Sequence, residues 1–251
     1  AAVFGGVQTL PVKTERGFLT PEQVREHIRP SNIHIPTTGL VCVENTHNRH
    51  GGTCCTPEAI EAVAAAAHAA GVPVHLDGAR LFNAAVALGR PVADFARPVD
   101  SLTFCLSKGL AAPVGSLVCG SRELVSRGRR VRKMLGGGMR QVGVLAAAGL
   151  VALDTMVERL AEDHANCRRL AEGLAALPRI RLDLATVQTN IVIFRVDRDG
   201  GAAELVTGGL ARKVKIHQAG PGTIRCVTHK DVDAEDIARA LEAFREITAA
   251  W

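Results

Sequence analysis

The stretch SLTFCLSKGLAAP, residues 101–113, places a lysine directly behind an apolar run. Residues 102–106 are apolar enough to form an interior strand, and Ser107, Lys108 and Gly109 end that strand abruptly. A buried ammonium group loses its hydration, so it must be paired or give up its proton. A desolvated lysine becomes a nucleophile that can form a Schiff base. The stretch therefore predicts a strand that delivers a reactive amine.

A second motif lies upstream, where VPVHLDGARLFNA, residues 72–84, ends an apolar run in Asp77, and Arg80 follows in the next turn or helix start. Ligands of a parallel sheet gather at the carboxyl ends of its strands, so Asp77 and Lys108 are expected to face one crevice. Pyridoxal phosphate (PLP) needs a lysine for its aldehyde and a carboxylate against its ring nitrogen. The pair therefore indicates a PLP site, with helix capping as the alternative role of Asp77.

Short apolar runs alternate with helical segments along the chain. Strands are predicted at 7–12, 40–43, 72–76, 102–106, 116–119, 190–196 and 224–228. Helices are predicted at 21–29, 57–70, 78–88, 121–135, 139–177, 205–211 and 234–249. The first half is typical of an α/β domain with a mostly parallel sheet covered on both faces. The second half predicts a small α+β domain, and we place the two domains at residues 1–150 and 151–251.

Composition argues against several classes of function. The 251 residues are 47% hydrophobic, and Lys plus Arg exceed Asp plus Glu by only 30 − 25 = 5. The basic run RGRRVRK, residues 127–133, is typical of a solvated helix face, and 3% aromatic residues without Tyr provide no base-stacking platform. We therefore expect no nucleic-acid partner. The longest uncharged apolar stretch, residues 142–153, is too short to cross a bilayer, so no membrane partner is expected.

The seven cysteines lie singly in apolar runs or as the adjacent pair Cys54–Cys55, and no CxxC motif occurs. Neither a metal site nor a redox dithiol is therefore expected. Reduced thiols favour an intracellular protein, and we expect it in the cytoplasm, with the mitochondrion as the alternative.

A third motif, LVCVENTHN at residues 40–48, carries polar side chains behind another predicted strand, at the same rim of the sheet. Asparagine and threonine are common in turns, so these residues can simply terminate the strand. His47 is a candidate for proton transfer, and a loop histidine that is satisfied by its neighbours is the alternative.

Four blocks of sequence resemble, in order and spacing, the low-specificity L-threonine aldolases of the beta-eliminating lyase group of PLP enzymes. The blocks are VENTHN, HLDGARLFNA, DSLTFCLSKGLAAPVGSLVCG and RKMLGGGMRQVGVLAAAG, and IRCVTHKDV extends the resemblance toward the C-terminus. The resemblance implies an aspartate aminotransferase-like fold (fold type I), with a large PLP-binding domain and a small C-terminal α+β domain.

The resemblance also implies roles for single residues. Lys108 would carry PLP as a Schiff base, Asp77 would pair with the pyridine nitrogen, and Arg80 would lie near the 3-hydroxyl. Arg225, in IRCVTH, resembles the arginine that binds the substrate carboxylate, a task suited to its bidentate guanidinium. His34, in NIHIPTTG, takes the place of a histidine that faces the substrate hydroxyl.

The base that removes the hydroxyl proton is then His34 or His47, directly or through water. Two basic residues around the triple glycine, Lys133 and Arg140, resemble residues near the cofactor phosphate that a neighbouring subunit contributes. Because family active sites form between subunits, a homodimer or homotetramer is expected.

The implied activity is that of a carbon–carbon lyase in threonine catabolism and glycine biosynthesis. Its substrate would be a β-hydroxy-α-amino acid, L-threonine or L-allo-threonine, whose Cα–Cβ bond is cleaved to release glycine and acetaldehyde. Cleavage requires that bond to stand perpendicular to the cofactor ring, an alignment that the carboxylate contact of Arg225 would favour.

The chain departs from the family pattern near its start. A small-residue turn with threonine that binds the cofactor phosphate, and a histidine that stacks on the ring, are not found before Gln8. Gly5 and Gly6 supply neither a hydroxyl nor a helix N-terminus for a phosphate. We therefore expect a chain that lacks its N-terminal part, and the alternative function is that of an impaired or inactive fragment or regulatory subunit.

Overall fold

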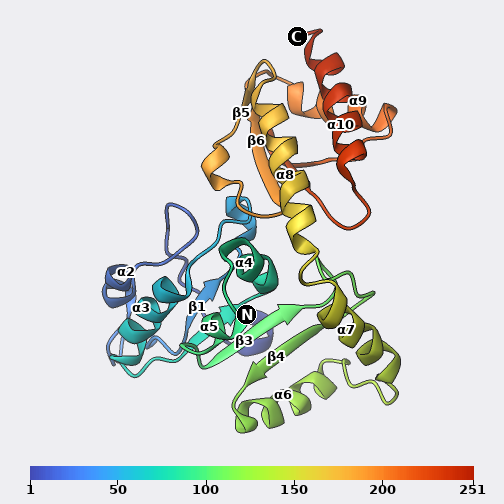
Figure 1. Cartoon of the computed structure of the whole chain (residues 1–251). Helices are drawn as coiled ribbons and strands as arrows, with labels where there is room; N and C mark the ends of the chain where they lie inside the picture. The colour runs from blue at the N-terminus through green and yellow to red at the C-terminus, as the bar shows by residue number, and fades with distance from the viewer.

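The first of two sheets carries most of the residues singled out above, and it is mostly parallel. The computed structural model describes residues 1–251, and Figure 1 shows this sheet in the lower part of the molecule. Its strands, in spatial order, are β1 (Val41–Glu44), β2 (Val74–Asp77), β3 (Ser101–Cys105) and β4 (Ser116–Gly120). β1, β2 and β3 run parallel, and β4 is antiparallel to β3. Each strand coincides with a predicted apolar run, so this part of the prediction is confirmed.

Helices pack on one face of this sheet. The elements of the first half are α1 (Ala2–Gly5), α2 (Pro21–His27), the 3-10 turn η1 (Asn48–His50), α3 (Pro57–His68), α4 (Leu81–Leu88), α5 (Val92–Ala96), α6 (Arg122–Met134) and α7 (Gly143–Thr155). Val74 and Leu76 of β2 are fully buried in clusters shared with α3. On the opposite face His75 is half-buried and Asp77 is exposed. The prediction that both faces are covered is therefore wrong, because alternate positions along β2 are polar.

Two helix starts are encoded by local sequence. Thr20 Oγ1 accepts a hydrogen bond from the backbone N of Gln23, and the Gln23 side chain accepts one from the backbone N of Thr20. This capping box precedes Pro21 at the first helical position, where a missing N–H does no harm. Thr56 Oγ1 caps α3 in the same way, from the backbone N of Ala59. The predicted starts of both helices are confirmed, and each cap contributes about 1 kcal/mol.

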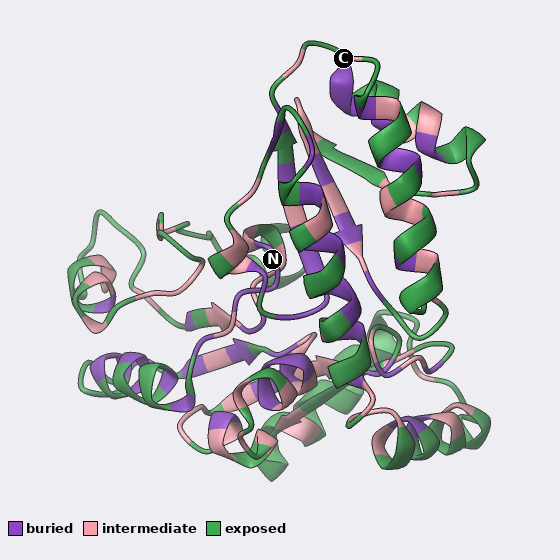
Figure 2. Ribbon diagram, turned by 45° about the horizontal axis from the view of Figure 1, so that its top comes forward, coloured by how far each residue is buried: buried purple, intermediate pink, exposed green.

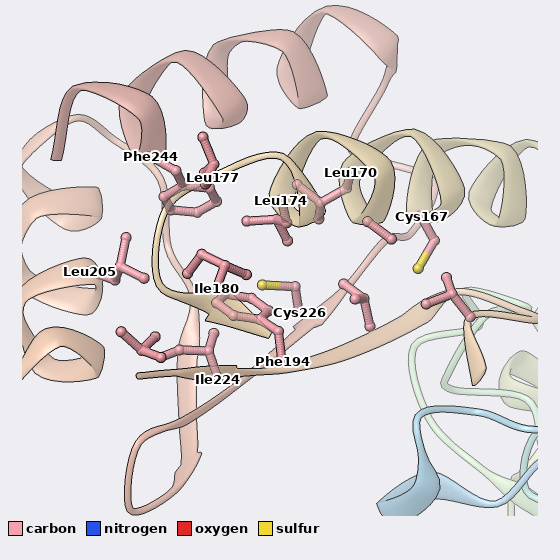
Figure 3. Close-up of a cluster of buried hydrophobic side chains, with 14 of the residues drawn as sticks. Cys167, Leu170, Leu174, Leu177, Ile180, Phe194, Leu205, Ile224, Cys226 and Phe244 are labelled. Carbon is pink, nitrogen blue, oxygen red and sulfur yellow. The ribbon is translucent and has the colours of Figure 1, made fainter. Parts of the chain in front are cut away.

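The second half of the chain forms an antiparallel sheet with a core of its own. Its strands, in spatial order, are β5 (Ile180–Arg181), β6 (Ile191–Val196), β8 (Thr223–Val227) and β7 (His217–Gly220). Its other elements are α8 (Leu160–Ala175), the 3-10 turn η2 (Leu184–Thr186), α9 (Gly201–Ala211) and α10 (Ala234–Thr248). Figure 3 shows Leu174 of α8, Phe194 of β6 and Phe244 of α10 pointing toward one another in this core. Burial of each such side chain contributes about 2 kcal/mol.

Helix α8 belongs to both cores. Leu160, at its start, is fully buried in a cluster with Leu106 and Leu110 of the first half, whereas Leu174 lies in the core of the second sheet. Figure 1 shows α8 running from the lower to the upper part of the molecule, and Figure 2 shows buried residues along it and exposed residues on its outer side. One continuous helix therefore helps to fix the two sheets relative to each other.

The long helix predicted at 139–177 is two helices, which is a correction. α7 ends at Thr155 and α8 begins at Leu160. The residues between them contain neither glycine nor proline, so no breaker marks the boundary in the sequence. Met156 and Val157 instead pack against the buried cluster around the start of α8. Tertiary packing, and not local propensity, therefore ends α7.

The strand predicted at 7–12 is also wrong, because those residues have an irregular backbone, are mostly exposed and pair with no strand of the chain. The sequence does not predict β5, β7 or α5. β5 has two residues and β7 reads HQAG, so neither carries an apolar alternation. The domain division at residue 150 stays a prediction, and that residue lies inside α7. None of the helices combines the length and the apolar character that crossing a membrane requires.

Candidate functional site

The parallel strands of the first sheet end at one edge, and Asp77 lies there. Glu44 and Asp77, the last residues of β1 and β2, are directly opposed in the parallel register, and Asp77 is also opposed to Thr103 of β3. Asp77 is exposed, and its Oδ1 accepts a hydrogen bond from the backbone N of Ala79 at 3.0 Å. Because α4 begins without a side-chain cap, Asp77 does not cap that helix. Its carboxylate keeps free capacity to accept further hydrogen bonds.

Lys108 follows β3 in a surface turn, and its side chain is exposed. The desolvated amine expected from the sequence is therefore not found, because the turn after β3 lies at the surface. The backbone beside it is nonetheless held firmly, since a Cβ on Gly109 would lie 2.8 Å from Leu160 Cδ2 and 3.3 Å from Asn83 Oδ1. The backbone next to Lys108 is therefore restrained by packing, while its side chain is exposed and can reach a ligand.

Two arginines from different sheets meet on one asparagine. Arg80, between β2 and α4, donates from Nη1 to Asn48 Oδ1 at 3.2 Å. Arg225, on β8, donates from Nη2 to the same oxygen at 2.9 Å. The backbone N of Asn48 donates to Glu44 Oε1 at 2.9 Å, which holds the start of η1 against β1. This contact joins the edge of the first sheet to the second sheet.

Neither guanidinium forms an ion pair within the chain. Burial lowers the pKa of Arg80, and the neighbouring charge of Arg225 lowers it further, while the carboxylate of Glu44 acts in the opposite direction. Burial also lowers the pKa of Arg225. Two partly dehydrated cations side by side repel each other, so an anion that approaches both is favoured.

Buried side-chain nitrogen and oxygen atoms without a hydrogen-bond partner occur in three residues. They are Thr46 Oγ1, Arg80 Nε and Arg225 Nε. Thr46, which is 2% exposed, follows β1 directly after Asn45 and lies two residues before Asn48. A buried donor left without an acceptor costs roughly 1–3 kcal/mol. The unpaired donors of both arginines therefore mark a place where a ligand would supply the missing acceptors.

His47 is engaged by its neighbours on both sides of its ring. Its Nδ1 lies 2.8 Å from Nδ1 of His50, and its Nε2 lies 3.6 Å from Glu44 Oε2. Burial lowers the pKa of His47, so the ring is neutral at pH 7. This environment agrees with the alternative of a loop histidine that is satisfied by its neighbours.

The remaining candidates make no contact with these residues. His34 is exposed in the irregular segment before β1, where its backbone N donates to Asn32 Oδ1 at 2.8 Å and its imidazole forms no hydrogen bond. Lys133 on α6 and Arg140 in the turn before α7 are exposed, and neither forms a hydrogen bond or ion pair within the chain. The Lys133 stem instead covers Gly138 of the triple glycine.

Asn48 is the residue that sequence reasoning misses at this site. It is part of the LVCVENTHN motif, where its only signal is that of a polar side chain behind a predicted strand. Its partners lie 32 and 177 residues away along the chain. No periodicity or spacing connects residues at such separations, so only the folded chain reveals the contact.

Comparison with known proteins identifies the family. Residues 1–198 match the family model described as beta-eliminating lyase. The chain belongs to the beta-eliminating lyase family. This beta-eliminating lyase is 40% identical to low-specificity L-threonine aldolase 1 of Arabidopsis thaliana, over 98% of this chain and 70% of that protein. It is 41% identical to the low specificity L-threonine aldolase of Escherichia coli strain K12, over 99% of this chain and 72% of that protein.

Solved structures show the same fold for this beta-eliminating lyase. The threonine aldolase of Leishmania major superimposes with a TM-score of 0.79 at 22% identity, over 96% of this chain and 71% of that chain. A structure of SPT with PLP superimposes with a TM-score of 0.65 at 20% identity, over 92% of this chain and 59% of that chain. The predicted α/β fold, the aspartate aminotransferase-like fold type I, is therefore confirmed.

Proposed function

We propose that this beta-eliminating lyase is a PLP-dependent carbon–carbon lyase that cleaves L-threonine and L-allo-threonine to glycine and acetaldehyde. The observation that carries the proposal is the pair of half-buried arginines, without ion pairs, beside the strand ends that bear an amine and a carboxylate. Identity of 40% to an L-threonine aldolase over nearly the whole chain supports it. The same likeness favours it over the alternative of an impaired fragment or regulatory subunit.

The residues at the strand ends fit PLP chemically. Lys108 would hold the aldehyde of PLP through its exposed amine, and the free acceptor capacity of Asp77 would suit a protonated ring nitrogen. The unpaired Nε of Arg80 suits an oxygen on the ring. When bound, PLP supplies an electron sink for the electron pair of a bond broken at the substrate Cα. Asp77 would maintain the positive charge that this requires.

Arg225 would bind the α-carboxylate of the amino acid. Its guanidinium uses Nη2 for Asn48 and leaves Nε without a partner, so it can still present two donors to a carboxylate. Such a two-point contact orients the substrate and also strengthens its binding. Orientation matters because only a bond held in the right alignment is cleaved.

The proton of the substrate β-hydroxyl needs an acceptor on the protein. His47 is neutral, but both of its ring nitrogens lie close to other side chains. His34 keeps a free imidazole, which supports His34 as the base that takes this proton while the Cα–Cβ bond breaks and the aldehyde leaves. We therefore favour His34 and keep His47 as the alternative.

We further propose that the chain works as a homodimer or homotetramer. Several apolar side chains are exposed on β4, α6 and α7: Val118, Val131, Met134, Val144, Leu150 and Val151. Lys133 and Arg140 lie along the same stretch, which is consistent with their reaching the cofactor phosphate of a neighbouring subunit. A cytoplasmic location also stays a prediction.

The test is to add PLP to the purified chain and record the yellow absorbance of lysine-bound cofactor. Wild type is expected to gain this absorbance and to release acetaldehyde from threonine in a coupled assay, and Lys108→Ala is expected to lose both. Lys230→Ala removes an exposed lysine far along the chain and serves as the matched control. Wild type without the absorbance refutes the cofactor, and absorbance without acetaldehyde refutes the reaction.

A further inference from the structure

We propose that Asn48 is a positioning residue that holds Arg80 and Arg225 together without neutralising them, and so keeps Arg225 available for a substrate carboxylate. This inference rests on the proposed function, because it concerns how the site selects an amino acid through its α-carboxylate. It assigns a role to a residue that forms no hydrogen bond with Asp77 or Lys108 but links the two sheets.

The geometry at Asn48 uses the full capacity of one oxygen. A side-chain carbonyl has two lone pairs, and Oδ1 accepts one hydrogen bond from Arg80 at 3.2 Å and one from Arg225 at 2.9 Å. The backbone of Asn48 is itself held, because its N–H donates to Glu44. The oxygen is therefore a fixed point that sets the spacing of two cations carried by different sheets.

The neutrality of the acceptor is what the proposal depends on. A carboxylate at this point would form ion pairs with both guanidinium groups and would compete, from within the chain, with any incoming carboxylate. An amide oxygen accepts the same hydrogen bonds but adds no net charge. Asn48 can therefore orient the arginines and still leave their charges to a ligand.

The nearby carboxylates of Glu44 and Asp77 attract Arg80 through their charge, but neither forms an ion pair with Arg80 or Arg225. Glu44 is committed to the backbone N of Asn48 through Oε1 and lies near His47 through Oε2, and Asp77 accepts from Ala79. The two arginines form no ion pair, and each keeps an unpaired buried Nε. The positive charges of Arg80 and Arg225 therefore remain available to an anionic ligand.

Asn48→Asp separates this role from a merely structural one. The new carboxylate still accepts both hydrogen bonds, and it attracts the two arginines while only Glu44 repels it. The melting temperature without PLP is therefore expected to equal or exceed that of wild type. Glycine, titrated against the PLP-loaded protein, is expected to bind about tenfold more weakly or worse, as a lost charge-assisted contact implies. KM for threonine should rise in parallel, with kcat within about threefold.

Asn48→Ala and Gln8→Glu complete the test. Asn48→Ala removes the acceptor and is expected to lower both the melting temperature and the affinity for glycine, since the arginines then separate. Gln8→Glu adds the same charge at an exposed residue of the irregular N-terminal segment and is expected to change neither quantity.

If Asn48 has only a structural role, the affinity for glycine should fall only where the melting temperature falls, in both Asn48→Asp and Asn48→Ala. The proposal is therefore overturned if Asn48→Asp binds glycine as tightly as wild type, or if it melts below wild type. Wild type that binds glycine but releases no acetaldehyde would refute the proposed reaction alone, because the glycine titration would still decide the role of Asn48.

Discussion

Several polar contacts join the halves of the chain, and two of them differ in how completely their groups are paired. At the site edge, Asn48 holds Arg80 and Arg225, which are half-buried cations with unpaired Nε atoms. Deeper in the molecule, Asn83 Nδ2 lies 3.0 Å from His164 Nε2 and 3.4 Å from Asn190 Oδ1. The first contact is charged and incomplete, whereas the second is neutral.

The deeper contact continues through further hydrogen bonds. Asn83 and Asn190 are 2% and 3% exposed, and Asn190 Nδ2 donates to the Thr228 carbonyl at 2.9 Å. Thr228 Oγ1 donates to the carbonyl of Asp163 at 2.6 Å. Buried polar groups that are fully paired stabilise one arrangement, while unpaired donors are retained where a ligand completes them. We infer that the contact around Asn83 holds the two halves together and that the contact around Asn48 serves to bind a ligand.

The largest expected effect is at Arg225. Arg225→Ala removes the proposed carboxylate contact, so kcat/KM for threonine is expected to fall about 1,000-fold, the equivalent of roughly 4 kcal/mol. Stability should not fall, because a dehydrated cation beside Arg80 is removed. Arg195→Ala, on the neighbouring strand β6, is exposed and is the control. A fall in the free energy of unfolding of Arg225→Ala as large as its loss in kcat/KM, both expressed in kcal/mol, would contradict the distinction between a binding contact and a stabilising one.

Asn83→Ala is expected to affect stability and not binding directly. It leaves His164 Nε2 and the buried Asn190 Oδ1 without their contact to Asn83, so the free energy of unfolding in urea should fall by about 3 kcal/mol. Asn48→Ala is the matched change in the half-buried contact, where water can replace the lost acceptor, and it should lose less than about 1 kcal/mol. Equal losses in the two variants would contradict the distinction drawn between the contacts.

The smallest expected effect is the pH dependence that His164 confers. Burial lowers the pKa of His164 from 6.5 to about 4 in the folded chain. Between these values the unfolded chain binds more protons, so stability is complete above about pH 6.5 and declines as the pH falls toward 4. From pH 7 to pH 5 this contribution falls by about 2 kcal/mol.

His164→Gln keeps an acceptor for Asn83 without a titrating ring. The measurement is urea unfolding of both proteins at pH 7 and pH 5, and the difference between them isolates the histidine from the other acidic and basic groups. Parallel losses in wild type and His164→Gln would show that His164 does not sense pH in this range.

Local sequence was sufficient for the elements that position the site. Thr20 and Thr56 cap their helices, and the short apolar runs at 72–76 and 102–106 predict β2 and β3. These features act over a few residues, where propensity and side-chain period decide the structure. The end of α7 and the strand β7 could not be predicted, because packing against distant residues produces them.

The sequence by itself determined the family, the fold class and the placement of Asp77 and Lys108 behind parallel strands, since each depends on short motifs and their order. Only the tertiary structure decided that Lys108 is exposed and that one asparagine joins two arginines across the sheets. The physical reason is the distance along the chain between the residues that interact. Caps and strand periods are local, whereas burial, charge pairing and the shared oxygen of Asn48 depend on groups that only folding brings within hydrogen-bond distance.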